Sequence, residues 1–423
     1  MKHTLLCLTL LLAFVVATAC KKQSYPIEVA AQKPAYGSCL VRVPVSGLQI
    51  NPSKPVTLYE SINGKERIIP CQIAADESGK ICLYWLLSGE MPANSKRFYR
   101  FETGKSKQRF PDLKITDTGK NLILKKGNNP ILSYRYALSD PVEGIDSIFC
   151  RSGFIHPAWS PAGNVLTNSQ PADHHHHYGI WNPWTRVVYD GATYDLWNLG
   201  DRQGTVAFKE MVDVCQGPVW TGFTARQDHL IFKENQKVCI MDELWKIKAW
   251  AVTDKGRDYF VWDFTSYLTP CTLLPVLLQE YRYAGFGYRA TGEWTKENCI
   301  MYTSEGLSRP KIDGTNARWI YITGAVGNGK SGLLMMGYPE NRKFPEPLRI
   351  WDEKANNERG DAFINFAPTK NEDWLLDAGK TYRLKYRVVT YDGDMTPEKA
   401  EQLWNDFANP PAVTIKQKPF GDF

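Results

Sequence analysis

From Cys39 onward the chain repeats one pattern, in which short apolar runs are separated by turn residues. Asn63-Gly64 separates the runs 56–62 and 67–73, and Ser78-Gly79 precedes another run over 81–87. Such spacing is typical of β-hairpins. Residues 381–390 alternate apolar and polar side chains, which indicates a strand with one buried face. We therefore predict an all-β protein made of a small N-terminal β-sandwich and a larger antiparallel sandwich.

One stretch near the C-terminus has the features of a helix. Thr396 is a suitable N-cap, Pro397 occupies the first helical position, and Glu398 and Glu401 lie in the first turn. Asn409-Pro410-Pro411 then ends the helix. We predict one C-terminal helix, followed by a short tail.

These patterns divide the chain into five parts. We predict a signal over 1–20, a polar tether over 21–36 and an N-terminal β-domain over 37–105, which a basic Gly- and Pro-containing linker at 104–111 follows. The larger domain occupies 112–395, and the helix and tail occupy 396–423.

The first residues predict export. Met1 and Lys2 precede an apolar run over 5–16, which is too short to span a bilayer and has the length of a signal-peptide core. The run ends at Ala17-Thr18-Ala19-Cys20 and resembles a bacterial lipoprotein signal, in which Cys20 is the lipidated residue. Ala17 stands where such signals usually carry Leu, so a plain secretory signal cleaved near Ala19 is the alternative. We expect an outer-membrane lipoprotein, held by its lipid alone, and the polar start at 21–24 favours the periplasmic side.

Charge and cysteine content exclude some partners. The 51 Lys and Arg against 45 Asp and Glu give a net charge of +6, which is too balanced for a nucleic-acid-binding protein. Eight of the ten cysteines follow the signal, and none forms a C-x-x-C pair, so no cysteine zinc site is predicted. An even count permits disulfides, and Cys71 and Cys82 flank a turn across which they could face each other. Buried free thiols are the alternative.

The segment from Gly324 to Ser331 matches the phosphate-binding pattern G-x-x-x-x-G-K-S. That pattern needs a helix directly after the loop, because the amides of the helix complete the phosphate cradle. Here a five-residue apolar run over 332–336 is closed by Gly337, Tyr338 and Pro339, which indicates a strand. We predict a glycine-rich hairpin with a solvated Lys330 and no bound nucleotide.

Four of the seven histidines stand together, from His174 to His177, directly after Asp173. On an extended backbone His174 and His176 would share one face, with Asp173, His175 and His177 on the other. Imidazoles so placed can form part of a site for one divalent metal ion or a proton-transfer pair, and a carboxylate such as Asp173 can fix the tautomer. An ordinary solvated loop is the alternative.

Further landmarks surround this run, at 154–157, 160–163, 179–181 and 195–197. Together they resemble a bacterial family labelled methane oxygenase PmoA, whose pattern has an Asp-His-x-His-His-x-Gly core followed by Asp-aromatic-Trp. The resemblance extends through 285–289, 338–341 and 376–393 and so covers roughly 112–395. The sequence differs at His175, where the family usually has Pro, and at 347–351, where the family carries a second histidine.

The resemblance implies a galactose-mutarotase-like supersandwich for 112–395, a fold used by sugar epimerases, polysaccharide lyases and glycosidases. It does not imply a membrane monooxygenase, because no apolar stretch after the signal approaches the length of a membrane helix. In that superfamily a His acid and a Glu or Tyr base usually act on the concave face.

The candidate catalytic residues are therefore His174, His176, His177, Glu280 and Arg289. Arg289 could clamp a substrate carboxylate, with an ordinary salt bridge as the alternative. Two other carboxylates on apparent strands, Glu243 and Asp263, are further candidates. The candidate substrate-binding residues are Asp173, Trp181, Arg186, Asp195, Trp197 and His156, and the candidate metal ligands are His174, His176 and His177.

Two functions fit these patterns. The first is an exported enzyme that acts on a glycan or modified sugar by hydrolysis, β-elimination or epimerisation, with the histidines at its centre. The second is a noncatalytic glycan-binding lipoprotein, in which aromatic side chains stack on sugar rings and the histidines only form hydrogen bonds.

Overall fold

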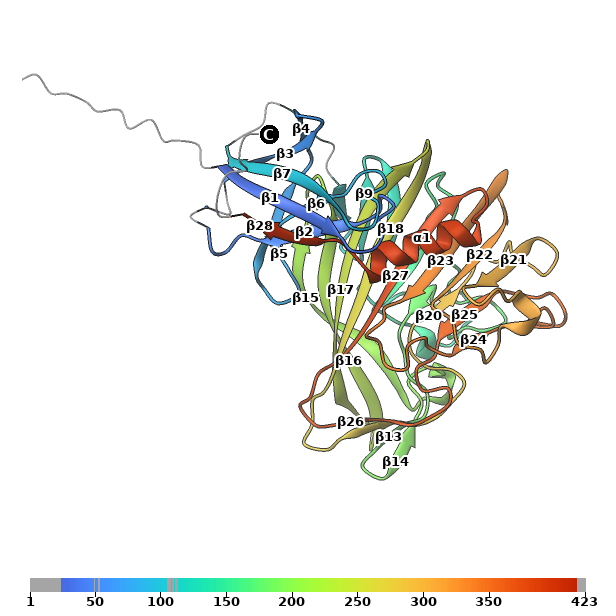
Figure 1. The fold of residues 1–423 in the computed structure, drawn as a ribbon. Helices are drawn as coiled ribbons and strands as arrows, with labels where there is room; N and C mark the ends of the chain where they lie inside the picture. The colour runs from blue at the N-terminus through green and yellow to red at the C-terminus, as the bar shows by residue number, and fades with distance from the viewer. Residues whose placement is uncertain are drawn as a thin grey trace, which may run out of the picture.

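The computed structural model describes residues 24–48, 50–51, 54–104, 108, 110, 113–140 and 142–416. Within these ranges the chain is built from antiparallel strands and one α-helix, α1 (Pro397–Ala408), as Figure 1 shows. The all-β prediction and the C-terminal helix are confirmed. Thr396 caps the helix, and its side chain accepts a hydrogen bond from the Lys399 amide at 3.2 Å. The described part of the chain contains no helix with the length and apolarity that crossing a membrane requires.

Two eight-stranded sheets form the larger sandwich. The first, named the long sheet, has the order β15 (Gly204–Cys215), β16 (Thr221–Lys233), β17 (Gln236–Asp254), β18 (Arg257–Pro270), β27 (Tyr382–Asp392), β23 (Gly329–Gly337), β22 (Trp319–Val326) and β21 (Cys299–Thr303). The second, named the site sheet, has the order β24 (Leu348–Ile350), β25 (Phe363–Phe366), β20 (Gly287–Arg289), β12 (Ile180–Trp181), β11 (Phe154–Ala158), β10 (Asn129–Arg135), β9 (Asn121–Lys126) and β8 (Leu113–Asp117).

A four-stranded sheet continues this sandwich at one end (Figure 1), in the order β14 (Ala192–Tyr194), β13 (Val187–Tyr189), β19 (Val276–Leu278) and β26 (Trp374–Leu376). Three short 3-10 turns lie in the connections of the described ranges, at Ser147–Phe149, Leu199–Asp201 and Arg309–Lys311.

The core of the larger sandwich lies between the long sheet and the site sheet. On β17, Trp245, Ile247 and Ala249 are buried in this core, whereas the intervening Lys246 and Lys248 lie on the outer face. This alternation follows from the two-residue repeat of a strand. Burial of one apolar face on each sheet holds the two sheets together.

The smaller sandwich has a five-stranded and a three-stranded sheet. The first has the order β28 (Ala412–Ile415), β1 (Ser24–Ala31), β7 (Ser95–Thr103), β3 (Val56–Ile62) and β4 (Lys65–Ile69), and the second has the order β2 (Leu40–Pro44), β6 (Ile81–Leu86) and β5 (Gln72–Ala75). Figure 1 shows β28, from the C-terminal end, beside β1.

These strands correct two boundaries of the predicted domains. Residues 24–31, which we expected in a polar tether, form β1, whose Ile27 and Val29 are fully buried. The predicted C-terminal tail contributes β28 to the same sheet, by pairing with β1 from Ile27↔Ile415 to Ala30↔Ala412. The expected signal and Cys20 lie outside the described residues, as does most of the expected linker.

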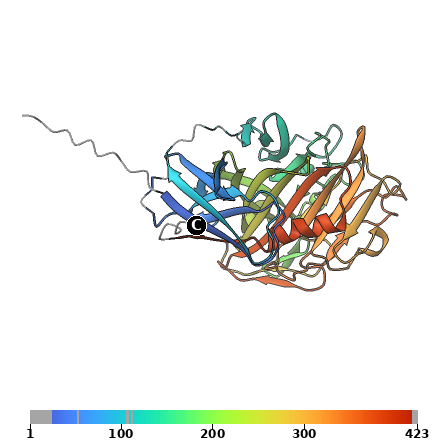
Figure 2. The same ribbon diagram turned by 45° about the horizontal axis from the view of Figure 1, so that its top comes forward.

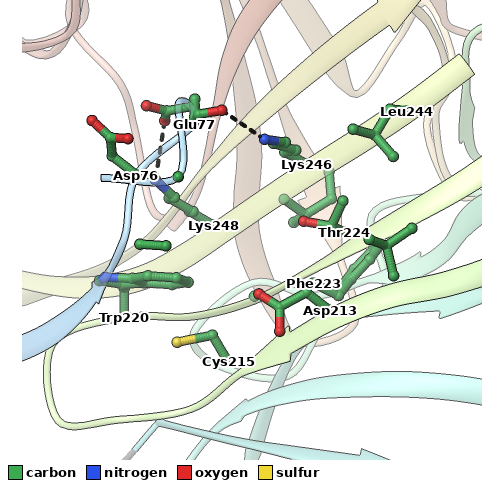
Figure 3. A pocket seen from close by; sticks show the side chains of 15 residues that line it. Asp76, Glu77, Asp213, Cys215, Trp220, Phe223, Thr224, Leu244, Lys246 and Lys248 are labelled. Carbon is green, nitrogen blue, oxygen red and sulfur yellow. Dashed lines mark hydrogen bonds and ion pairs between the residues drawn. The ribbon is translucent and has the colours of Figure 1, made fainter. Parts of the chain in front are cut away.

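The smaller sandwich rests on the outer face of the long sheet, which is seen from a second direction in Figure 2. At this seam, shown in Figure 3, Lys248 Nζ lies 3.0 Å from Glu77 Oε1, and Lys246 Nζ donates to the Glu77 carbonyl oxygen at 3.0 Å. Gln72 Oε1 accepts hydrogen bonds from the backbone amides of Val219 and Trp220. A pocket of about 230 Å³ lies at the seam, and its charged groups are largely occupied by these contacts.

The phosphate-loop-like segment forms the predicted hairpin. β22 and β23 pair from Trp319↔Met336 to Val326↔Gly329, so a strand follows the glycine-rich turn. Lys330 Nζ forms an ion pair with Asp394 at 2.7 Å on the surface.

Of the two alternatives left open for Cys71 and Cys82, the structure shows free thiols that do not face each other. In the ladder of β5 and β6, Cys82 lies opposite Ala74, and its side chain is buried in the core of the larger sandwich. Cys71 precedes β5 and packs against the core of the smaller sandwich. The two thiols therefore lie on opposite faces of their sheet.

Candidate functional site

The candidate site lies on the outer face of the site sheet. Ile180, Tyr288, Ile364 and Ile350 occupy one row across β12, β20, β25 and β24, and all four belong to the core between the sheets. The next positions along these strands therefore point to the opposite face. They carry Trp181, Arg289, Phe363 and Arg349, which lie at or beneath the site.

The histidine run forms two consecutive turns, named the histidine turn (residues 171–178). The His174 amide donates to the Pro171 carbonyl oxygen at 3.0 Å, and the His177 amide donates to the His174 carbonyl oxygen at 3.1 Å. The expectation of an extended backbone, with His174 and His176 on one face, is wrong. Turns bring positions three apart together, so the rings of His174 and His177 stack with their centroids 4.9 Å apart.

Asp173 orients His174. Asp173 Oδ2 lies 2.9 Å from His174 Nδ1, and the His174 side chain is 35% exposed. Because the carboxylate occupies Nδ1, the second ring nitrogen, Nε2, is available to a ligand. An imidazole held in this way can transfer a proton.

Arg289 ties the histidine turn to the site sheet. Its Nη2 lies 3.0 and 2.8 Å from the two Asp173 oxygens and 3.1 Å from Asp361 Oδ2, while its guanidinium carbon lies 4.7 Å from the Trp351 ring centroid. The side chain is 2% exposed. Arg289 is therefore satisfied by protein carboxylates, and its expected role as a clamp for a substrate carboxylate is corrected to that of an internal ion pair.

The charges around Asp173 hold it ionised. Burial by itself would raise the pKa of Asp173, but the hydrogen bond with His174 and the charge of Arg289 lower it to about 2. Burial also lowers the pKa of the Arg289 guanidinium from its usual value, against the opposing charge of Asp173. An ionised Asp173 is the form that holds a proton on His174 Nδ1.

Of the other two candidate metal ligands, His177 is buried and His176 is half-buried. His177 is fully buried among Trp181, Trp351 and Phe363, and this burial lowers its pKa well below the usual value. Burial also lowers the pKa of His176 to about 4. Both rings are therefore neutral near neutral pH. They pack against the His174 ring and do not line the pocket described next.

A pocket of about 330 Å³ opens beside His174. Its lining includes two aromatic residues, Tyr283 and Trp351, and the Trp351 ring centroid lies 4.6 Å from that of His174. Polar residues form much of the remaining lining, together with two small or aliphatic residues: Asp313, Arg349, Asp352, Lys354 and Asn356, with Ile350 and Ala355. The pocket is thus mainly polar, with aromatic surface on one part of its wall, and convergent polar groups of this kind can fix the orientation of a small ligand.

The Tyr283 hydroxyl is the second proton-carrying group of this pocket. Its oxygen accepts hydrogen bonds from Arg349 Nη2 at 2.9 Å and from Trp351 Nε1 at 3.0 Å. Because two donors occupy the oxygen, the hydroxyl proton is free to be donated to a ligand.

Sequence reasoning missed Tyr283, Trp351 and Asp361. Tyr283 lies in the loop after β19, Trp351 directly follows β24, and Asp361 precedes β25, so all three are far from the histidine turn in the chain. The sequence signal for Trp351 is the segment 347–351, which differs from the resembled family by lacking its histidine.

Residues 121–405 match the model of a family described as a family of unknown function, DUF6807. The chain belongs to this family. No curated protein matches the chain. A solved structure described as a polysaccharide lyase is 14% identical with a TM-score of 0.27, over 70% of this chain and 34% of that chain. The chain thus spans about a third of the length of that lyase.

In this DUF6807 chain two of the expected sugar-binding tryptophans belong to the support of the site. Trp181 and Trp197 are buried, with ring centroids 5.1 Å apart, and Trp197 also packs 5.7 Å from Tyr283. Asp195 accepts hydrogen bonds from the amides of Trp197 and Asn198, so its carboxylate shapes that turn. None of the three lines the pocket.

Three further candidates lie apart from the pocket lining. Arg186 is exposed and lies 6.0 Å from the Tyr281 ring centroid, and Glu280 is also exposed. His156 on β11 bonds through Nδ1 to Thr167 Oγ1 at 2.9 Å, and burial lowers its pKa to about 4.

The two other carboxylates have structural partners in this DUF6807 chain. Glu243 is fully buried between the two sheets, where Oε2 lies 2.9 Å from His229 Nε2 and Oε1 accepts from Asn182 at 2.6 Å. Asp263 pairs with Arg387 at 2.6 Å. Neither lines the pocket beside His174.

The predicted metal ligands do not form a ligand set. Across the described residues, no group of three or more His, Cys, Asp or Glu side chains is arranged to hold a metal ion. The physical reason is visible in the histidine turn, where Asp173 occupies His174 Nδ1 and His177 is enclosed by aromatic rings. The metal assignment is therefore corrected to a hydrogen-bonded and stacked cluster.

Proposed function

We propose that this chain is an exported carbohydrate-active enzyme that acts on a glycan or modified sugar by proton transfer through His174. The observation that carries the proposal is the Asp173–His174 pair at the edge of an open pocket. A carboxylate-oriented imidazole exchanges protons efficiently near neutral pH. Hydrolysis, β-elimination and epimerisation all require such an exchange.

The pocket also suits a sugar ring. Trp351 and Tyr283 supply flat aromatic surface, and Asn356, Lys354 and Asp352 supply groups that can bond to hydroxyls. The Tyr283 hydroxyl can donate a second proton in the same pocket. Trp351 links the two groups, because its ring contacts His174 and its Nε1 donates to the Tyr283 oxygen. We assign His174 and Tyr283 as the two proton-transfer groups, with Arg349 holding the Tyr283 oxygen.

The test is a screen of the purified chain against glycans and modified sugars, with the release of reducing ends, of unsaturated products and of epimers as readouts. On a substrate that is turned over, His174→Ala should lower kcat by roughly 100-fold or more, as should Tyr283→Phe. His175→Ala is the matched control, because its ring contacts Phe149 and does not line the pocket. We expect its kcat to stay within about twofold of wild type.

Two outcomes would contradict the proposal. Equal loss of kcat in His174→Ala and His175→Ala would show that the histidine turn acts only through its fold. Glycan binding without turnover, weakened in Trp351→Ala, would favour the noncatalytic glycan-binding lipoprotein.

We also propose that the mature chain is a lipoprotein anchored through Cys20 on the periplasmic side of the outer membrane. The support is the apolar run and the small residues that precede Cys20. Mass spectrometry of the mature N-terminus should find a diacylglycerol on Cys20, and Cys20→Ala should release the chain from membranes. Digestion of the protein by protease added to intact cells would contradict the periplasmic side.

A further inference from the structure

Two cysteines that do not line the candidate site lie in direct contact. Cys239 is on β17, and Cys271 directly follows β18, the neighbouring strand. Their Sγ atoms are 3.0 Å apart, and Cys271 Sγ lies 3.2 Å from the Cys239 carbonyl oxygen. Among the residues that the structure describes, no other two cysteine sulfurs are recorded in hydrogen-bond contact.

The strand geometry explains this contact. β17 and β18 pair up to Met241↔Pro270, and the Cys271 amide donates to the Ile240 carbonyl oxygen at 3.1 Å. Between β16 and β17 the register passes from His229↔Met241 to Leu230↔Cys239 and leaves Ile240 unpaired. Such a bulge redirects the neighbouring side chain. Cys239 thereby lies beside Cys271 at the end of the ladder.

We propose that Cys239 and Cys271 form a disulfide that closes this end of the long sheet. A disulfide needs its sulfurs at about 2 Å, so the two atoms must approach by only about 1 Å. Cys271 is exposed and Cys239 is partly buried, so an oxidant can reach the pair. The bond would hold the start of the exposed loop 272–275, in which Leu273 is 97% exposed, against β17.

The chemistry is thiol–disulfide exchange, with a small-molecule or protein disulfide as the oxidant. Cys271 loses its proton, attacks one sulfur of that disulfide and expels the other as a thiolate, which takes up a proton. Cys239 then loses its proton, attacks the mixed disulfide at Cys271 and expels the second thiol. The two cysteines are oxidised, and the external disulfide is reduced to two thiols.

The contact between the thiols assigns these roles. The hydrogen bond from Cys239 lowers the pKa of Cys271, whereas the same contact raises the pKa of Cys239. The exposed thiol is therefore the attacking group, because the thiolate is the nucleophile in exchange.

The experiment uses the folded full chain incubated with glutathione disulfide, followed by alkylation, digestion and mass spectrometry without reduction. We expect a cross-linked peptide pair that joins Cys239 to Cys271, lighter by two hydrogen atoms than the separate peptides. The oxidised protein should melt roughly 5 °C above the reduced protein. In Cys239→Ser the reaction should stop with glutathione bound to Cys271.

Cys150→Ser is the matched control, because Cys150 is also partly buried and has no cysteine in contact. It should keep both the cross-link and the melting shift, and the Cys239→Ser/Cys271→Ser double variant should lose both. The proposal is overturned if wild-type chain treated with glutathione disulfide shows no cross-link, and Cys271 is instead found alkylated or bound to glutathione. Cross-links spread over other cysteine pairs would overturn it equally.

Discussion

His156 shows how burial makes one side chain sensitive to pH. Burial lowers its pKa from 6.5 to about 4, and the charge of Arg135 adds to this effect. Between these pH values the unfolded chain binds a proton that the folded chain does not bind. The stability that the neutral ring contributes is therefore present above the unfolded pKa of 6.5 and is lost as pH falls towards about 4.

We expect this residue to remove on the order of 3 kcal/mol from the free energy of unfolding between about pH 7 and about pH 4. His156→Gln should remove that share of the pH dependence, as measured by urea unfolding across this range. His175→Gln, at the surface, is the control and should keep the wild-type slope. An unchanged slope in His156→Gln would contradict the assignment.

Arg289 stabilises the charges of two carboxylates, Asp173 and Asp361. Its removal takes away the cation that Asp173 and Asp361 share, and it leaves the 4% exposed Asp361 with Arg359 as its ion-pair partner and Asp173 with His174. We expect Arg289→Ala to lower the free energy of unfolding by about 3 kcal/mol, because two largely buried carboxylates lose one of their positively charged or hydrogen-bonding partners. Arg186→Ala, which removes an exposed arginine, should change it by less than about 0.5 kcal/mol. Denaturant unfolding of both variants checks the prediction, and equal effects would refute it.

At the scale of elements, the junction between the histidine turn and β12 depends on Gly179. Its φ is +66°, and a Cβ there would lie 2.4 Å from the Ile155 carbonyl oxygen on β11. The amide of Arg289 also donates to the Gly179 carbonyl oxygen at 2.7 Å. The turn, β11 and β20 therefore meet at a point where only glycine fits.

We expect Gly179→Ala to cost about 3 kcal/mol, from backbone strain together with the clash. Gly191→Ala is the matched control, because its φ is +76° and nothing lies within 4 Å of the added Cβ. It should cost about 1 kcal/mol, the strain alone. Denaturant midpoints of the two variants give the comparison, and a cost at Gly179 no larger than that at Gly191 would contradict the role of the close approach.

At the scale of the whole molecule, the C-terminal helix joins the two sandwiches. Asp406 on α1 is 2% exposed, and it accepts hydrogen bonds from the amides of Tyr36 and Ser38 at 2.7 and 2.8 Å and from Ser38 Oγ. The same helix packs on the long sheet, where Trp404 Nε1 donates to the Gly337 carbonyl oxygen. After it, β28 completes the sheet of the smaller sandwich.

We expect the two sandwiches to unfold in one cooperative transition. Asp406→Ala should lower the free energy of unfolding by about 3 kcal/mol, because two buried donors of Ser38 and the partly buried Tyr36 amide lose their acceptor. Calorimetry and tryptophan fluorescence should report coincident midpoints in both proteins. Asp394→Ala, an exposed change, is the control. Two separated transitions in the wild-type chain would show that the sandwiches are independent.

The local features of this protein could be predicted from its sequence. The alternation over 381–390 became β27, Thr396 and Pro397 begin α1, and the run after Gly329 is a strand that rules out the helix of a phosphate loop. Each depends on side chains a few residues apart, whose periodicity or capping is visible in the chain itself. The same local reasoning named Asp173 as a carboxylate that can fix a histidine tautomer, but the extended backbone that it assumed placed Asp173 and His174 on opposite faces, whereas the turn brings them together.

Contacts between residues far apart in the chain could not be predicted in this way. The site needs Ile180, Tyr288, Ile364 and Ile350 to align in one row across four strands, which then brings Arg289, Trp351 and Asp361 to the histidine turn. The same holds for β28 beside β1 and for Cys239 beside Cys271. Strand order and register are set by the packing of whole sheets, because a shift by one residue turns every side chain to the other face.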